Sequence, residues 1–226
     1  MVLNYNEVVA LDLAFWKEKN MKIRAVAERG YPLNYPENTI SSFQAAIDLD
    51  FTHTKLEVHL TKDGVPVVMQ DATINRMTSG RGEIRSFTYN ELSQLSINHD
   101  EKIPTLEEVL RVTKGKIKTG IEIVQSGFYI GLEKKVTALI NKLGAEKDVF
   151  LLSRNHHTWA RLRILSNDVE LGLLTDEPNP FDFHIMKELG VFYYAIKFDF
   201  ETVQQLASMG LEKNGIQPIV WTVNTI

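Results

Sequence analysis

The sequence contains no cysteine, so disulfide bonds and thiol catalysis are excluded. It has no basic excess either: 25 Lys and Arg against 29 Asp and Glu give a formal net charge of −4, which does not indicate a nucleic-acid partner. No apolar run approaches the ~20 residues that a transmembrane helix needs. Internal repeats and low-complexity linkers are also missing. We therefore expect a single domain over residues 1–226, and the lack of cysteine is compatible with a cytoplasmic location.

Short apolar strands alternate with amphipathic segments along most of the chain. Strands are predicted at residues 23–27, 56–60, 119–124, 149–153, 171–175, 193–198 and 218–224. Helices are predicted from residue 40 to 49 and at 106–113, 132–143, 157–165, 181–189 and 201–209. This alternation favours a parallel sheet with right-handed crossovers.

The predicted fold class is therefore α/β, a TIM (β/α)8-type barrel. Such barrels typically take about 250 residues. The 226 residues here show seven parallel strands, so the barrel is expected to be short of its last strand and helix. A hairpin and a long insertion are predicted after the second strand.

The first residues have their own pattern. No basic segment precedes the apolar run from Val8 to Trp16, and Asp12 interrupts it, so a secretory signal is not expected. The pattern from Glu7 to Asn20 predicts an amphipathic helix that packs on the barrel. The alternatives are a peripheral membrane contact through Phe15 and Trp16, or an interface in an oligomer of unknown size.

The segment from Lys55 to Asp71 concentrates polar residues around a hairpin. Glu57 and His59 lie two residues apart and therefore share one strand face. Asp63-Gly64 is a strong hairpin-turn signal, and the returning strand ends at Gln70-Asp71. The irregular stretch from residue 72 to 102 contains one clear short helix at 89–95, and long segments of this kind are usually functional.

In such barrels the active site lies at the carboxyl ends of the strands. Polar or aromatic side chains are expected there at Glu28, Arg29, Glu57, His59, Gln70, Asp71, Glu122, Ser153, Lys197, Trp221 and Asn224. Glu57, His59 and Glu122 form a candidate metal set that suits Mn²⁺ or Zn²⁺, and Arg29 is placed to bind a phosphate or carboxylate. The alternatives are that each Glu pairs with a neighbouring base, that His59 is a satisfied polar residue, and that Trp221 belongs to the core.

Several segments together resemble the glycerophosphodiester phosphodiesterase family. They are AERGYPLNYPENTISSFQAA, LEVHLTKDGVPVVMQDATINRMTSGRG, IPTLEEVL, GIEI and VWTVN, in the family's order and spacing. The resemblance extends from Ile23 to Asn224 and implies the TIM-barrel phosphodiesterase fold. It also implies metal-dependent hydrolysis of a small-molecule glycerophosphodiester to glycerol 3-phosphate and an alcohol, with Mg²⁺, Ca²⁺ or Mn²⁺.

Carried over by position, the resemblance also shows departures. The two catalytic His positions of the family are Glu28 and Gln70 here, and a phosphate-binding Lys position is Val124. Glu57 and Glu122 match the family's metal-binding acids, with His59 taken as the ligand between them. The family residues Arg29, Glu37, Asn38, Asp71 and Trp221 are retained.

These departures predict impaired hydrolysis. In the family the two His serve as general acid and base, which typically contributes about 10²–10⁴-fold. Gln70 has no proton to give up near neutral pH. A rearranged site remains an alternative, with Glu28 as a base or extra metal ligand and Lys197 replacing the lost Lys. The other hypothesis is a non-catalytic relative that binds a phosphodiester, a lipid headgroup or a protein partner.

Overall fold

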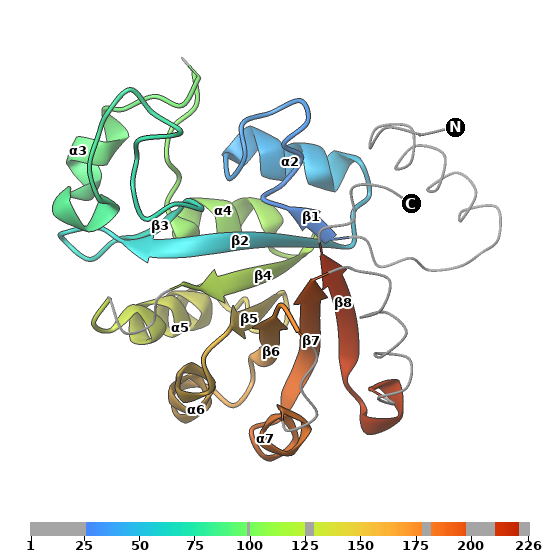
Figure 1. Cartoon of the computed structure of the whole chain (residues 1–226). Helices are drawn as coiled ribbons and strands as arrows, with labels where there is room; N and C mark the ends of the chain where they lie inside the picture. The colour runs from blue at the N-terminus through green and yellow to red at the C-terminus, as the bar shows by residue number, and fades with distance from the viewer. Residues whose placement is uncertain (1–25, 99, 125–128, 178–181, 198–210, 222–226) are drawn as a thin grey trace.

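The protein is an α/β half-barrel in a computed structural model that describes residues 26–98, 100–124, 129–177, 182–197 and 211–221. Seven parallel strands follow the order β1-β2-β4-β5-β6-β7-β8, and β3 pairs antiparallel with β2 (Figure 1). The strands are β1 Val26–Glu28, β2 His53–Leu60, β3 Pro66–Val68, β4 Lys118–Ile123, β5 Val149–Ser153, β6 Glu170–Thr175, β7 Val191–Lys197 and β8 Gln217–Trp221. The seven parallel strands, the hairpin and the TIM-type fold class are thus confirmed.

The described helices are α2 Ile40–Asp48, α3 Tyr89–Ser93, α4 Leu106–Thr113, α5 Leu132–Leu143, α6 His156–Leu165 and α7 Asp182–Glu188, with single 3₁₀ turns η1 Ile84–Ser86 and η2 Glu212–Asn214. The helices lie along the outside of the curled sheet, except α3, which belongs to the long segment after β3 (Figure 1). The predicted N-terminal helix, with Phe15 and Trp16, lies outside the described residues, and so does the predicted helix at 201–209. None of the described helices combines the length and apolarity that a membrane span requires.

Local sequence signals set where these helices begin. The Thr39 hydroxyl accepts a hydrogen bond from the Ser42 amide and caps α2. Thr88 and Thr105 each form a capping box, with Glu91 at the start of α3 and Glu108 at the start of α4. These caps satisfy amides that would otherwise lack partners in the first turn.

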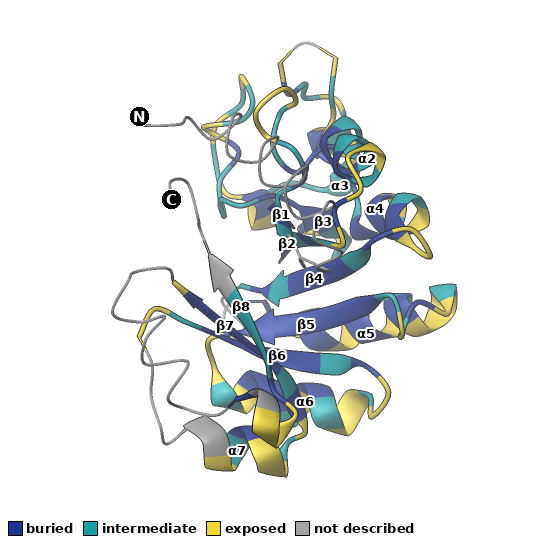
Figure 2. Cartoon of the chain, turned by 90° about the vertical axis from the view of Figure 1, so that its right-hand side faces the viewer, coloured by how far each residue is buried: buried dark blue, intermediate teal, exposed yellow. Residues whose placement is uncertain are grey.

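Most strand residues of the sheet are buried (Figure 2), and the two faces of the sheet differ in chemistry. On β2, Leu56, Val58 and Leu60 belong to the large core shared with the helices. Successive side chains alternate between faces, so Lys55, Glu57 and His59 point to the inner face. A second apolar cluster, Phe150, Leu152, Leu174, Tyr193 and Ala195, comes from alternating positions of β5, β6 and β7. The inner face is therefore apolar along β5–β7 and charged along β2.

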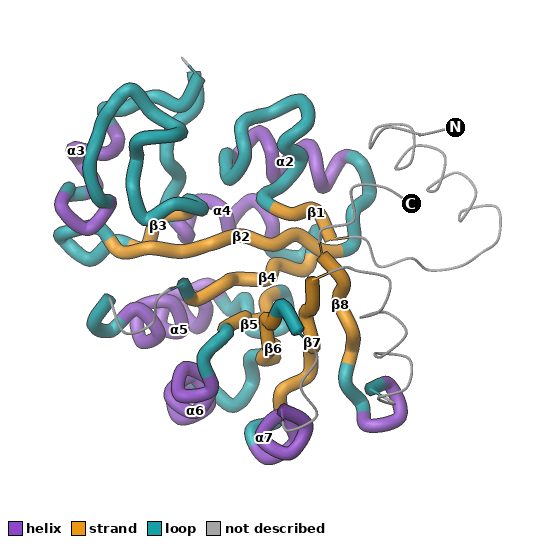
Figure 3. The backbone as a smooth tube through the Cα atoms, viewed as in Figure 1, coloured by secondary structure: helices purple, strands orange, loops and turns teal. Residues whose placement is uncertain are grey.

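The long segment after β3 is drawn mainly as loop in Figure 3. It nevertheless has its own small core, made by Val67, Met69, Ile74, Ile84, Leu92, Ile97 and Ile103. The Ile84 amide donates to the Ala72 carbonyl at 2.9 Å, and the Ile74 amide donates to the Gly82 carbonyl at 3.0 Å. The segment is thus folded against β3, and it delivers polar side chains to one end of the sheet.

Candidate active site at the carboxyl ends of the strands

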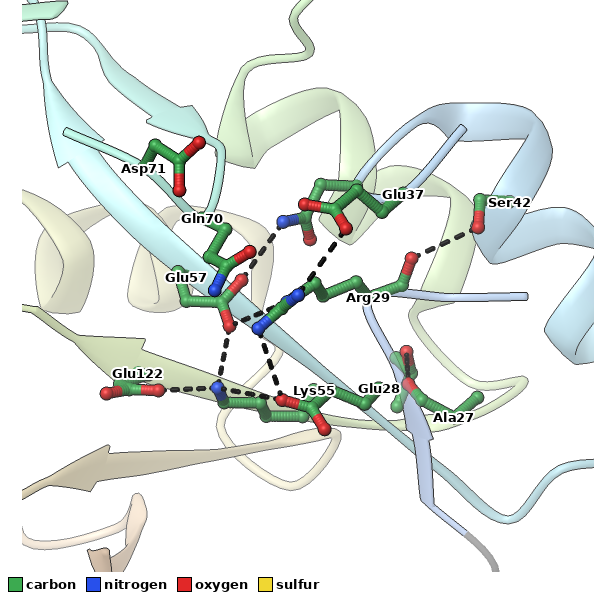
Figure 4. Close-up of polar contacts among 12 residues, drawn as sticks. Ala27, Glu28, Arg29, Glu37, Ser42, Lys55, Glu57, Gln70, Asp71 and Glu122 are labelled. Atoms are coloured by element: carbon green, nitrogen blue, oxygen red, sulfur yellow. Dashed lines mark hydrogen bonds and ion pairs between the residues drawn. The ribbon is translucent and has the colours of Figure 1, made fainter. Parts of the chain in front are cut away.

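Strand register brings the acidic side chains of β1, β2 and β4 to one place. Glu28 is the register partner of Lys55, and Glu57 is the partner of Glu122. The carboxyl ends of neighbouring parallel strands meet at the same edge of a sheet, where ligand sites of α/β folds lie. The polar cluster at this edge is shown in Figure 4.

Lys55 lies at the centre of this cluster. Its ammonium nitrogen is 2.5 Å from Glu122 Oε2, 2.7 Å from Glu57 Oε1 and 3.6 Å from Glu28 Oε1 (Figure 4). The Lys55 side chain is only 14% exposed. Burial alone would lower the pKa of Lys55, but the charges of Glu57 and Glu122 outweigh burial and raise it. Lys55 is therefore a buried, permanently charged ammonium at neutral pH.

Arg29 contributes the second cation. Its Nε donates to Glu57 Oε1 at 3.2 Å and its Nη1 donates to Glu37 Oε2 at 3.4 Å, while Nη2 lies 3.6 Å from Glu28 Oε1. Burial alone would lower the pKa of Arg29, but Glu57 and Glu28 hold it above its usual value. The Arg29 side chain as a whole is 23% exposed, so it is only partly covered by the protein.

The chain makes a tight turn to place Arg29. Arg29 itself has a φ of 60° and Gly30 a φ of 84°. A Cβ at Gly30 would lie 2.4 Å from the Ser42 hydroxyl oxygen, so only glycine fits where β1 passes α2.

Glu57 is the most buried carboxylate of the cluster, with 4% of its side chain exposed. Its Oε2 accepts a hydrogen bond from Asn38 Nδ2 at 3.0 Å. Burial alone would raise the pKa of Glu57, but Lys55 and Arg29 outweigh burial and lower it. Glu57 is therefore ionised, and both of its oxygens already accept bonds from protein donors.

A third cation, Arg76, organises the rim of the site. Its Nη2 donates to Glu37 Oε1 at 2.5 Å and to Gln70 Oε1 at 3.0 Å, and its Nε donates to Asp71 Oδ2 at 2.7 Å. Hydrogen bonds to Glu37 and Asp71 raise the pKa of Arg76. Arg76 thereby orients the Gln70 side chain, whose amide oxygen Oε1 already accepts a hydrogen bond.

His59 does not join the acids. Its Nδ1 lies 3.0 Å from the Tyr129 hydroxyl and its Nε2 lies 3.2 Å from the backbone carbonyl oxygen of Gln70. A carbonyl only accepts, so Nε2 carries the proton and Nδ1 accepts from the Tyr129 hydroxyl. Burial lowers the pKa of His59, which keeps the ring neutral. Both ring nitrogens are used, and no lone pair is left for a metal ion.

The predicted metal set of Glu57, His59 and Glu122 therefore differs from the observed arrangement. Among the described residues, no group of three or more His, Asp or Glu side chains has the geometry to hold a metal ion. The carboxylates do converge, but the Lys55 ammonium lies between them at hydrogen-bonding distances. The residues at this strand end do not fit the divalent cation that the family resemblance implies.

Lys197 and Trp221 end β7 and β8, the last two strands in the order of the sheet. The two residues are register partners at the ends of β7 and β8, and Lys197 is exposed. The side chain of Trp221 lies outside the described part of the structure. Their predicted contact with a substrate stays a prediction.

Two cluster residues were not identified from the sequence. Lys55 was detectable, because it precedes Glu57 by two positions and a strand period of two puts both on one face. Arg76 had no such signal, since it lies in the irregular segment after β3 and reaches Glu37 across 39 positions of the chain. The structure brings the other predicted residues together around these two: Glu28, Arg29, Glu37, Asn38, Glu57, Gln70, Asp71 and Glu122.

Comparisons with known proteins agree on one family. Residues 29–226 match the glycerophosphoryl diester phosphodiesterase family model. A glycerophosphodiester phosphodiesterase from Caldanaerobacter subterraneus subsp. tengcongensis is 32% identical over 218 residues, covering 90% of this chain and 87% of the relative.

Solved structures show the same fold. The glycerophosphodiester phosphodiesterase of Thermotoga maritima is 26% identical, with a TM-score of 0.74 over 90% of this chain and 87% of its own. A phosphodiesterase of Oleispira antarctica, solved with sn-glycerol 3-phosphate, is 24% identical, with a TM-score of 0.77 over 88% of this chain and 84% of its own.

Proposed function

We infer that this chain, which belongs to the glycerophosphoryl diester phosphodiesterase family, binds glycerophosphodiesters at the carboxyl ends of β1, β2 and β4 but does not hydrolyse them efficiently. The proposal depends mainly on which side chains stand at positions 28 and 70, where the resemblance implies catalytic His, and on what these side chains contact. Both positions hold side chains that are already engaged, and neither side chain is an imidazole.

Position 70 lacks the chemistry of a general acid. An alkoxide leaves a phosphodiester slowly unless a proton is delivered to it, and a positioned acid typically contributes about 10²–10⁴-fold. The amide of Gln70 has no such proton, and its oxygen accepts from Arg76. The ring of His59 does not supply the missing acid, because its Nε2 lies 3.2 Å from the backbone carbonyl oxygen of Gln70 and its Nδ1 lies 3.0 Å from the Tyr129 hydroxyl.

Position 28 lacks the freedom of a general base. The Glu28 carboxylate lies 3.6 Å from both Lys55 Nζ and Arg29 Nη2, and both contacts are ion pairs within the protein. Glu28 is thus held in the ion-pair network at the position where the resemblance implies an imidazole. This arrangement is suited to keeping Arg29 in place for a ligand rather than to moving protons.

Arg29 is the residue best placed to bind the phosphodiester. Its contacts to Glu28, Glu37 and Glu57 use fewer N–H groups than a guanidinium has, so donors remain for a ligand oxygen. The exposed ammonium of Lys197, at the end of β7, is a second candidate for the same phosphate. Two cations on different strands would hold one phosphodiester without acid–base catalysis.

The test separates binding from turnover in one preparation. We would follow glycerol 3-phosphate release from glycerophosphocholine with Mg²⁺, Ca²⁺ or Mn²⁺ added, and measure binding by calorimetry. The Caldanaerobacter relative is the positive control for the assay. We expect binding to this chain, loss of binding in Arg29→Met, and no release above background.

Two results would overturn the proposal. Release that disappears in Glu57→Ala would establish a hydrolase with a rearranged site. Failure of the folded protein to bind glycerophosphocholine at millimolar concentration would exclude the binding role. The variant Glu28→His plus Gln70→His restores both imidazoles and tests whether acid–base groups alone limit turnover.

A further inference from the structure

We infer that the Lys55 ammonium occupies the cation position of this strand end, so that Glu28, Glu57 and Glu122 surround a cation carried by the chain instead of a divalent metal ion. The inference concerns ion binding only, and it holds whether or not a glycerophosphodiester binds. It rests on the mismatch between the family's implied metal and the residues found here.

The Lys55 ammonium is surrounded by carboxylates. An ammonium has three N–H donors and no acceptor, and Lys55 Nζ faces three carboxylates from three neighbouring strands. The distances of 2.5 and 2.7 Å to Glu122 and Glu57 are those of charge-assisted hydrogen bonds. The third carboxylate, Glu28, completes the set at 3.6 Å. Lys55 thus uses the oxygens that a hard divalent ion would need.

Both carboxylate oxygens of Glu57 already have partners within the protein. Its Oε1 lies 2.7 Å from Lys55 Nζ and 3.2 Å from Arg29 Nε, and its Oε2 accepts from Asn38 at 3.0 Å. A metal ion at this carboxylate would have to displace one of these donors. It would also bring two positive charges next to a buried ammonium, and like charges at contact distance repel strongly.

The backbone also fixes Lys55 in place. Lys55 is the third residue of β2, in register with Glu28 on β1 and Gly120 on β4. Gly120 has no side chain beside the Lys55 stem, and the Phe150 ring lies 2.5 Å from where a Gly120 Cβ would be. The stem therefore runs along a fixed strand between fixed neighbours, and the ammonium cannot leave without breaking its ion pairs.

The test is direct measurement of Mn²⁺ binding by electron paramagnetic resonance, which counts free and bound ion without any turnover. Wild-type protein is expected to bind no Mn²⁺ at this site. Lys55→Glu converts the cluster into an all-oxygen set and should bind one Mn²⁺ per chain, at least about tenfold more tightly than any residual Mn²⁺ binding elsewhere on the wild-type protein. Lys62→Glu is the matched control: it makes the same charge change on an exposed residue beyond β2 and should not gain binding.

Lys55→Met is a second variant that tests the proposal if Lys55→Glu does not fold. It removes the charge, keeps an unbranched side chain, and leaves three carboxylates facing one another, so it should also gain Mn²⁺ affinity over wild type. If Lys55→Glu is unstable without ions, its melting temperature should rise with added Mn²⁺ while that of Lys62→Glu stays constant.

The proposal is overturned if wild type binds one Mn²⁺ per chain and Glu57→Gln abolishes it. It is equally overturned if both Lys55 variants are folded, as judged by circular dichroism, and neither gains affinity over Lys62→Glu. Neither result depends on glycerophosphodiester binding or release, so failure here is distinguishable from failure of the proposed function.

Discussion

Asn38 shows how a single side chain supports the cluster in two ways. It is 3% exposed, donates to the Glu57 carboxylate at 3.0 Å and has a φ of 59°, in the left-handed region. Asn38→Ala should lower the free energy of unfolding by about 3 kcal/mol, since a hydrogen bond to a charged group contributes about 1.5–3 kcal/mol and a left-handed Cβ costs about 1 kcal/mol. Urea unfolding monitored by circular dichroism measures this loss.

Asn38→Gly is the matched control for this prediction. Glycine also removes the donor but accepts the positive φ without strain. It should therefore be less destabilising than Asn38→Ala by about 1 kcal/mol. Equal losses in the two variants would show that backbone conformation contributes nothing at this position.

At the residue scale, sequence patterns located the cluster but not its internal pairing. Glu28, Glu57 and Glu122 were expected at neighbouring strand ends, and they do meet there. The partner of His59 could not be predicted, because Tyr129 lies 70 positions away and no local pattern links them. An imidazole beside two acids suggests a metal ligand until the structure shows that both of its nitrogens are used.

Among the elements, α4 offers a clean test of helix capping. The Thr105 hydroxyl accepts from the Glu108 amide at 3.2 Å, and the Glu108 carboxylate accepts from the Thr105 amide at 2.8 Å. Thr105→Ala should lower the free energy of unfolding by about 1 kcal/mol, whereas Thr105→Ser keeps the hydroxyl and should change it little. Thermal denaturation of the two variants compares them, and an equal shift in both would contradict a capping role.

The capping box of α3 should make stability depend on pH. A hydrogen bond from the Thr88 amide lowers the pKa of Glu91 below its ordinary value of 4.5. A carboxyl with a depressed folded-state pKa stabilises the protein above its unfolded-state pKa, and this contribution is lost as pH falls through the folded-state pKa. The stability advantage of wild type over Glu91→Gln should therefore shrink below about pH 4.5.

Urea unfolding of both proteins between neutral pH and pH 3 checks this expectation. A constant difference between wild type and Glu91→Gln across that range would contradict it. The pKa of Glu91 is lowered mainly by short hydrogen bonds from Thr88 and not by distant charges, so added salt should not remove the effect.

Apolar patterns predicted most elements to within a few residues but placed the start of β2 too late. The predicted strand began at Leu56, whereas β2 begins at His53. Its first residues are polar because the Thr54 hydroxyl donates to the Ala27 carbonyl and Lys55 enters the ion-pair cluster. A search for apolar residues thus stops short of a strand whose inner face is charged, and for this reason Lys55 was missed.

At the scale of the whole molecule, the charge of the site should select the ligand. The ion-pair cluster contains five acids (Glu28, Glu37, Glu57, Asp71, Glu122) and three bases (Arg29, Lys55, Arg76), so its net charge is 3 − 5 = −2. A negative site disfavours dianionic ligands. Zwitterionic glycerophosphocholine should therefore bind about tenfold, or about 1.4 kcal/mol, more tightly than glycerol 3-phosphate.

Calorimetric titration of both ligands at low and high ionic strength tests this preference. Salt screens exposed charges, so the difference should narrow as ionic strength rises. Tighter binding of glycerol 3-phosphate at low salt would contradict the charge argument and would point to a further cation near the phosphate.

The overall architecture followed from strand–helix alternation, which depends on local apolar periodicity and on the right-handed crossover rule. The seven parallel strands and their order in the sheet were predictable on that basis. The packing of the segment after β3 was not, because its small core joins Val67 to Ile103 through contacts between irregular stretches. Periodicity carries no information where the backbone has no repeating geometry.

The position of Lys55 has a consequence for how the sheet assembles. A site that holds a free ion exists in an apo and a holo form, and its stability follows the ion concentration by mass action. The Lys55 ammonium is covalently part of β2, so it pairs with the carboxylates of β1, β2 and β4 as soon as these strands associate during folding. With the Lys55 ammonium in the cation position, as inferred above, we expect the stability of this strand end to depend neither on metal-ion concentration nor on a chelator.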